Sequence, residues 1–253
     1  MLEAAFWGFA GASSLVIAAE VAFRVTLSRM LVGLIMAFGV GTLISSIAFE
    51  LVEPALAATG ETWPIVLGML VGSLVFFAGD RAVAGLGAPR RKGAGVDDTQ
   101  ARDDGHATSD GGGLGIALGT ALDGVPESMV LGMSVASLGS VGPALLVAIW
   151  ISNFPESLGS SVGLLASGRS RTWVRVLWWT VAAMSAVAAA VGFALVNTAG
   201  PHLGAVVQAF AAGALLTMIA DEMAPQAFGR SALYTGLATT AGFVVAFLLS
   251  SLE

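Results

Sequence analysis

Long uninterrupted apolar blocks constrain this chain more than any other feature of its sequence. A helix needs roughly 20 apolar residues to cross the hydrocarbon core of a bilayer, whereas a transmembrane β-strand needs about 10 residues of alternating polarity. The sequence has the first pattern and lacks the second. We therefore expect an all-α membrane protein with eight transmembrane helices, at approximately 4–23, 30–52, 63–84, 113–137, 141–167, 173–197, 203–225 and 231–252.

The composition excludes several other classes of protein. Charged residues make up 11% of the chain, against about 25% in an ordinary soluble domain, so a soluble fold of this length would have too little charge to cover its surface. The absence of cysteine excludes disulfides, thiolate metal sites and cysteine nucleophiles. No basic stretch with interleaved aromatic residues points to a nucleic-acid partner. The start, Met1-Leu2-Glu3, lacks the positive region of a cleaved signal peptide, so the first block is expected to be a retained helix.

One stretch, 85–112, differs from the rest of the chain. It is rich in glycine and aspartate, with one basic cluster at 90–92 and a single histidine, His106. Such a composition cannot bury enough apolar surface to fold. We predict a disordered cytoplasmic loop between the third and fourth helices, within a single transmembrane domain that covers 1–253.

The basic residues predict the orientation of the helices. With eight spans, all 11 lysine and arginine residues fall in or beside the odd-numbered connections, and none in the even-numbered ones. Cytoplasmic loops carry the excess of these residues. We therefore predict a multi-pass protein of the cell membrane with both termini outside. The residues are Arg24, Arg29, Arg81, Arg90, Arg91, Lys92, Arg102, Arg169, Arg171, Arg175 and Arg230.

Two segments of the chain resemble each other. Residues 38–50 and 210–222 share the pattern Phe-x-x-Gly-x-Leu, followed by Ile-Ala-x-Glu, at a constant offset of 172 residues. A proline follows each segment, at Pro54 and Pro225. The predicted orientation runs the two segments in opposite directions. This combination indicates an inverted repeat, which is frequent in transporters whose binding site lies near the membrane midplane.

Acidic residues lie in the middle of the fourth and fifth helices, in Asp123-Gly-Val-Pro-Glu127-Ser and Ser152-Asn153-Phe-Pro-Glu156-Ser. A carboxylate at the centre of a transmembrane helix costs about 2.5–3.5 kcal/mol on insertion scales. Neither helix supplies an internal basic residue. A bound divalent cation would instead favour the ionised form of each carboxylate.

The hairpin register brings these residues to matching depth. Counting outward from the turn at 139–140, Asp123 is level with Glu156, and Glu127 is level with Ser152. A proline precedes each glutamate, and because proline removes a backbone hydrogen bond, we expect bent helices with freed carbonyls. The predicted metal ligands are Asp123, Glu127, Asn153 and Glu156, while Ser152, Glu50, Asp221 and Glu222 are left open.

The paired proline-containing helices with a Pro-Glu core resemble those of the ZIP (Zrt/Irt-like) metal transporters. The resemblance covers most of the chain and includes Gly79-Asp80-Arg81 at the end of the third helix. It implies a 3+2+3 bundle with the inverted repeat, a homodimer, and transport of a divalent metal ion towards the cytoplasm. It implies zinc as the substrate, with no resident cofactor and no enzymatic activity.

The sequence departs from the family pattern at four positions of these two motifs. Asp123 and Gly124 stand where the family has His-Asn, and Ser152 and Asn153 stand where it has His or Gln followed by an acid. Oxygen ligands suit harder ions than imidazole does. Manganese and iron therefore remain alternatives to zinc.

Of three other candidate functions, two are compatible with the sequence. The chain could be a ZIP-like metal-binding or regulatory membrane protein that transports nothing. The acids could be proton sites of a carrier for an organic substrate. An intramembrane aspartic protease is disfavoured, because residues 77–80 read Phe-Ala-Gly-Asp and not Gly-x-Gly-Asp.

Overall fold

The structure, a computed structural model, describes the backbone of residues 1–85 and 111–252, and their side chains except at 83–85, 111–123 and 201. The predicted loop 85–112 therefore lies, apart from its ends, outside the described residues. Every element within the described ranges is helical. The elements are α1 (Leu2–Ala22), α2 (Arg29–Ser46), η1 (Ile47–Val52), α3 (Glu53–Thr59), α4 (Thr62–Gly85), α5 (Gly111–Leu138), α6 (Pro143–Ala166), α7 (Arg171–Met218), η3 (Ile219–Met223), α8 (Ala224–Ser231) and α9 (Thr235–Ser250).

The helices have the length and composition of membrane spans. Within the described part of the chain, five stretches are long and apolar enough to cross a bilayer, and Thr235–Ser250 is a shorter apolar helix. This confirms the prediction of an all-α chain with membrane-spanning helices. The five stretches are Leu2–Ala22, Arg29–Thr59, Thr62–Ala82, Arg171–Gly200 and His202–Ser231.

A helix covers each of the eight apolar blocks, although two boundaries differ from expectation. Helix α7 runs through the predicted gap near 198–202, but Gly200 has φ 76° and ψ 169° and so divides it into two helices. Only glycine adopts this conformation readily. Helix α9 begins at Thr235 and not at 231, because Ser231 still belongs to α8.

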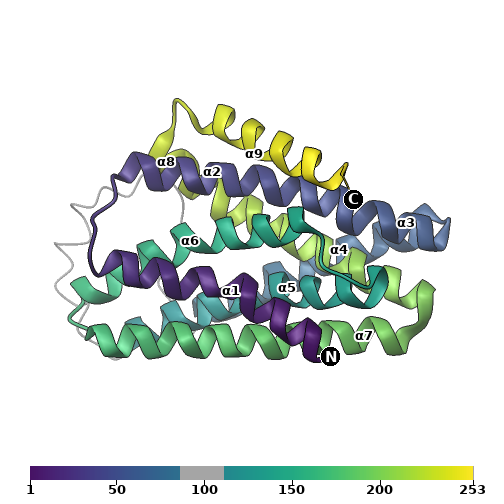
Figure 1. Cartoon of the computed structure of the whole chain (residues 1–253), viewed down its shortest axis with the longest axis horizontal. Helices are drawn as coiled ribbons and strands as arrows, with labels where there is room; N and C mark the ends of the chain where they lie inside the picture. The colour runs from purple at the N-terminus through teal and green to yellow at the C-terminus, as the bar shows by residue number, and fades with distance from the viewer. Residues whose placement is uncertain (86–110, 253) are drawn as a thin grey trace.

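The bundle places its connections at two ends, as Figure 1 shows. The α1–α2, α6–α7 and α8–α9 connections lie at one end, on the left of the view, and both termini and the α3–α4 connection lie at the other. Arginines lie in or beside the first set of connections, among them Arg24, Arg29, Arg169 and Arg230. We call this the basic end of the bundle.

Packing groups the helices around α7 and α2. Helix α7 packs against α1, α4 and α5, while α2 packs against α6, α8 and α9. The shared core contains Leu43, Leu131, Leu145 and Leu215, each 0% exposed. Helix α6, which carries Glu156, therefore lies between α1 and α2.

Glycines allow close approach where helices cross. A methyl group built on Gly132 in α5 would overlap the carbonyl oxygen of Ala189 in α7, and one on Gly192 in α7 would overlap that of Met129 in α5. The two helices can come this close only because both positions are glycine. Small residues commonly allow such close approach between membrane helices. The same reciprocal overlap occurs at two further crossings, Gly41 with Gly242 between α2 and α9, and Gly72 with Gly213 between α4 and α7.

Two short π-helical segments, η1 and η3, interrupt the long helical stretches Arg29–Thr59 and His202–Ser231. The backbone N–H of Glu53 donates to Ala48, and that of Ala224 donates to Ile219, each five residues back in the chain. Pro54 or Pro225 follows next and has no N–H to continue an α-helical ladder. Such π-bulges occur frequently at functional sites, and these two hold Glu50 and Glu222.

The fourth and fifth predicted helices, α5 and α6, were expected to bend at their internal prolines. Pro126 lies inside α5 and Pro155 inside α6, and both helices continue through their proline. The bends expected at these two prolines stay a prediction. Irregular backbone that the sequence did not predict lies at η1 and η3, which both pack against α2 and α7.

Candidate functional site

A hydrogen bond between Ser152 and Glu127 joins α6 to α5 at the predicted site. The Ser152 hydroxyl donates to Glu127 Oε1 over 3.1 Å and to the Ile149 carbonyl over 2.9 Å. Glu127 is 3% exposed and Ser152 is 2% exposed. The hydrogen bond confirms that these two residues are level in the hairpin, as the count from its turn predicts.

The second oxygen of Glu127 is not satisfied by the protein. Oε2 is buried and has no hydrogen-bond partner within the described part of the chain. A buried polar atom without a partner costs about 1–3 kcal/mol, and more when it is charged. Glu156 adds to this cost, since its charge acts on Glu127. A proton or a cation beside the unpartnered oxygen of Glu127 would lower this cost.

A small cavity opens beside this pair. Ser152 and Glu156 of α6 line it, together with Glu222 of η3 and Gln226 of α8. Its volume is about 20 Å³, which has room for little more than one water molecule, since one water needs about 10–15 Å³. In this conformation the cavity fits a bare ion and not an organic molecule.

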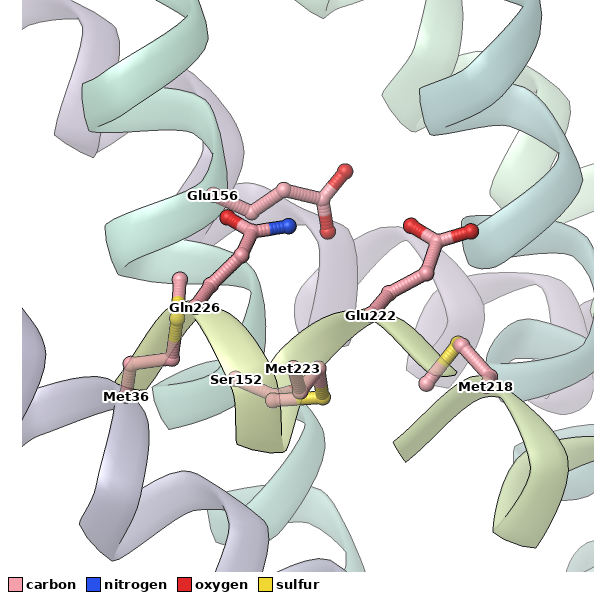
Figure 2. Close-up of a pocket in the computed structure, with 7 residues that line it drawn as sticks. All are labelled: Met36, Ser152, Glu156, Met218, Glu222, Met223 and Gln226. Atoms are coloured by element: carbon pink, nitrogen blue, oxygen red, sulfur yellow. The ribbon is translucent and has the colours of Figure 1, made fainter. Parts of the chain in front are cut away.

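The polar ends around the cavity converge from two sides. Figure 2 shows the Glu156 carboxylate and the Gln226 amide on one side, with the Glu222 carboxylate opposite them. Ser152 connects this cavity to Glu127, because it lines the cavity and also donates to the Glu127 carboxylate. Three helical segments thus line the cavity with oxygen atoms of two glutamates, one amide and one hydroxyl, and Glu127 of a fourth contacts its wall through Ser152.

The remaining predicted ligands are placed less fully. Asn153 is buried in α6, at 4% exposed, next to Ser152. Asp123 belongs to α5, but its side chain lies outside the described residues. Among the side chains that the structure does describe, no group of three or more His, Cys, Asp or Glu residues is arranged to hold a metal ion. The predicted ligand set stays a prediction.

Three acids that the sequence left open have distinct positions. Glu222 lines the cavity, whereas Asp221 beside it is exposed. Glu50 is 4% exposed and accepts a hydrogen bond from Ser250 Oγ of α9 over 3.2 Å. Glu222 therefore joins the candidate site, while the exposed side chain of Asp221 does not line it.

Four lining residues were missed from the sequence. Gln226 follows Glu222 by four residues, a spacing that puts both on one helix face and could have revealed it. The other three, Met36, Met218 and Met223, have no such signal because methionine is an ordinary core residue. Thioether sulfur favours softer ions than oxygen does. The cavity lining therefore suits softer metal ions than the predicted oxygen ligands alone would.

The Ser152 hydroxyl gives a test that does not depend on function. Ser152→Ala removes the donor to the buried Glu127 carboxylate, and we expect a loss of about 1.5–3 kcal/mol of unfolding free energy, typical of hydrogen bonds to charged groups. Thermal unfolding in detergent measures it. Ser128→Ala is the matched control, because Ser128 is buried but donates only to the Gly124 carbonyl of its own helix, over 2.7 Å. Equal effects of the two changes would contradict the assigned contact.

The sequence of this chain matches no family model and no curated protein.

Proposed function

We propose that this protein is a carrier that moves a divalent metal cation through a carboxylate-lined site between α5, α6 and η3. The observation that carries the proposal is Glu127, a carboxylate buried in the bundle with one oxygen that has no hydrogen-bond partner in the described residues. Glu156 and Glu222 nearby add negative charge. A divalent cation compensates such a cluster better than a single hydrogen bond can.

The cavity supports an ion as the cargo. Its volume of about 20 Å³ leaves no room for an organic substrate in this conformation, which argues against the proton-coupled organic carrier. Mixed oxygen and thioether lining suits zinc or a neighbouring transition metal better than magnesium. Zinc is therefore the proposed substrate, with manganese and iron as the alternatives that the oxygen ligands allow.

The architecture proposed for transport is eight membrane spans in a 3+2+3 arrangement with an inverted repeat. Two helical stretches, Arg29–Thr59 and His202–Ser231, support the repeat, because each contains a π-helical segment with a glutamate that a proline follows. The two stretches run in opposite directions in Figure 1. Equivalent glycines, Gly41 and Gly213, each cross a neighbouring helix closely. Relative movement of the repeats around a fixed site would provide alternating access.

The proposed orientation puts the basic end in the cytoplasm and both termini outside the cell membrane. The grouping of arginine-bearing connections at one end supports it. By the family resemblance, transport runs towards the cytoplasm and the protein is a homodimer.

Uptake by proteoliposomes tests the proposal. Purified protein is reconstituted and offered Zn²⁺, Mn²⁺, Fe²⁺, Cd²⁺ and Mg²⁺ in turn, with protein-free liposomes as the blank. We expect saturable uptake of Zn²⁺ and weaker uptake, or none, of Mg²⁺. Metal binding without flux would favour the non-transporting alternative, and the absence of uptake of every cation would overturn the carrier.

A further inference from the structure

One arginine lies next to the candidate site on the side of the basic end. Arg230 is in the last turn of α8, four residues after the cavity-lining Gln226. Four residues advance a helix by about 6 Å. The Arg230 backbone is therefore about one turn from that of Gln226, and Nη1 of its guanidinium is buried.

Two glycines on neighbouring helices lie against this residue. A methyl group on Gly159 of α6 would lie 3.6 Å from Nη2 and 3.9 Å from Nη1 of Arg230, and one on Gly33 of α2 would lie 2.6 Å from its Cβ. The guanidinium thus lies against the α6 backbone, and the start of the side chain lies against α2.

These three residues form a layer directly beside the cavity. Gly33 precedes the cavity-lining Met36 by three residues, and Gly159 follows the cavity-lining Glu156 by three. Helix α2 starts at the basic end, whereas α6 and α8 finish there. Each residue of the layer is therefore one turn closer to the basic end than its partner in the cavity. Of the three, only Arg230 has a side chain that can fill the layer.

We propose that Arg230 closes the cavity towards the basic end, and that its movement opens the path there. The guanidinium lies against Gly159, in a layer to which α2 and α6 contribute only glycines, and its positive charge opposes the passage of a cation. Where it assigns the route of the metal, this inference rests on the proposed function. The closure itself is a property of the packing, and it can be tested without any metal.

The absence of cysteine in the natural chain makes a labelling test direct. Met223→Cys places one thiol in the cavity lining, and Ser46→Cys places one in a buried position of α2 that is ten residues beyond Met36, away from the basic end. Purified protein in detergent, without metal, is treated with a cationic and with an anionic methanethiosulfonate reagent. The rate of modification reports access to each thiol.

We expect Arg230→Ala to raise the rate at Met223→Cys by about tenfold, the factor for a change of ~1.4 kcal/mol in the free energy of opening. The rate should rise with both reagents, because alanine removes the bulk of the Arg230 side chain as well as its charge. Arg230→Lys keeps the charge and much of the stem, so a smaller rise is expected. The rate at Ser46→Cys should not change.

Refilling the layer is the decisive step. Gly159→Leu added to Arg230→Ala should restore slow modification at Met223→Cys, whereas Gly236→Leu, on an exposed face of α9 where an added methyl group meets nothing, should not. Arg24→Ala, which removes an exposed arginine at the same end, should have no effect. An unchanged rate in Arg230→Ala, or an equal rise at Ser46→Cys, would overturn the closure. Neither result depends on whether the protein transports a metal.

Discussion

Glu127→Gln is expected to lower zinc uptake by at least about tenfold, since even residues that only support a metal ligand cost 10–100-fold when they are replaced. Glutamine keeps the size of the side chain and can still accept the hydrogen bond from Ser152. It removes the charge that a divalent cation would neutralise. Combined with Glu156→Gln, the change should abolish uptake in proteoliposomes.

The control for this prediction is a glutamate outside the site. Glu61→Gln removes one carboxylate from the exposed α3–α4 connection and should leave uptake unchanged. Thermal unfolding of each variant separates loss of transport from loss of fold. Because the carboxylates oppose one another without a cation, the metal-free Glu127→Gln protein should be at least as stable as the natural one. Normal uptake by the double variant would refute the role of this pair.

Gly132→Ala is expected to destabilise the bundle by about 1–3 kcal/mol, the usual cost of overpacking, and the value should lie at the upper end of that range. The added methyl group would overlap a backbone carbonyl oxygen of α7, which cannot turn aside as a flexible side chain can. Helices α5 and α7 would have to separate. Thermal unfolding in detergent measures the change.

A second glycine in a helix serves as the matched control. Gly163→Ala in α6 adds the same methyl group where no atom lies within 4 Å. It should leave stability unchanged or raise it by about 0.5–1 kcal/mol, because alanine has the higher helix propensity. If the two substitutions have the same effect, the close crossing of α5 and α7 is not as described.

Much of the fold could be predicted because hydropathy is a strong signal along the chain. The apolar blocks located the helices, and Gly200-Pro201 marked the point at which α7 divides. The hairpin register of Glu127 and Ser152 was also predicted correctly, since both helices are regular on either side of a short turn. These features depend on local sequence and on distance along a helix.

What the sequence did not reveal depends on contacts between distant segments. Pro126 and Pro155 are tolerated in continuous helices, while the π-helical turns lie before Pro54 and Pro225. Sequence alone does not show which proline the surrounding helices will accommodate. Likewise, a methionine such as Met36 reads as core packing until α2 is placed against α6 and η3.

The central claim is that a metal ion binds at the cavity that Glu156 and Glu222 line, next to Glu127. Crystals of the purified protein soaked in Zn²⁺ and measured at the zinc absorption edge test it directly. We predict an anomalous peak about 2.0–2.2 Å from carboxylate oxygens of at least two of these glutamates, the usual zinc–oxygen distance. Peaks confined to surface residues, with the three carboxylates unoccupied at saturating zinc, would contradict it.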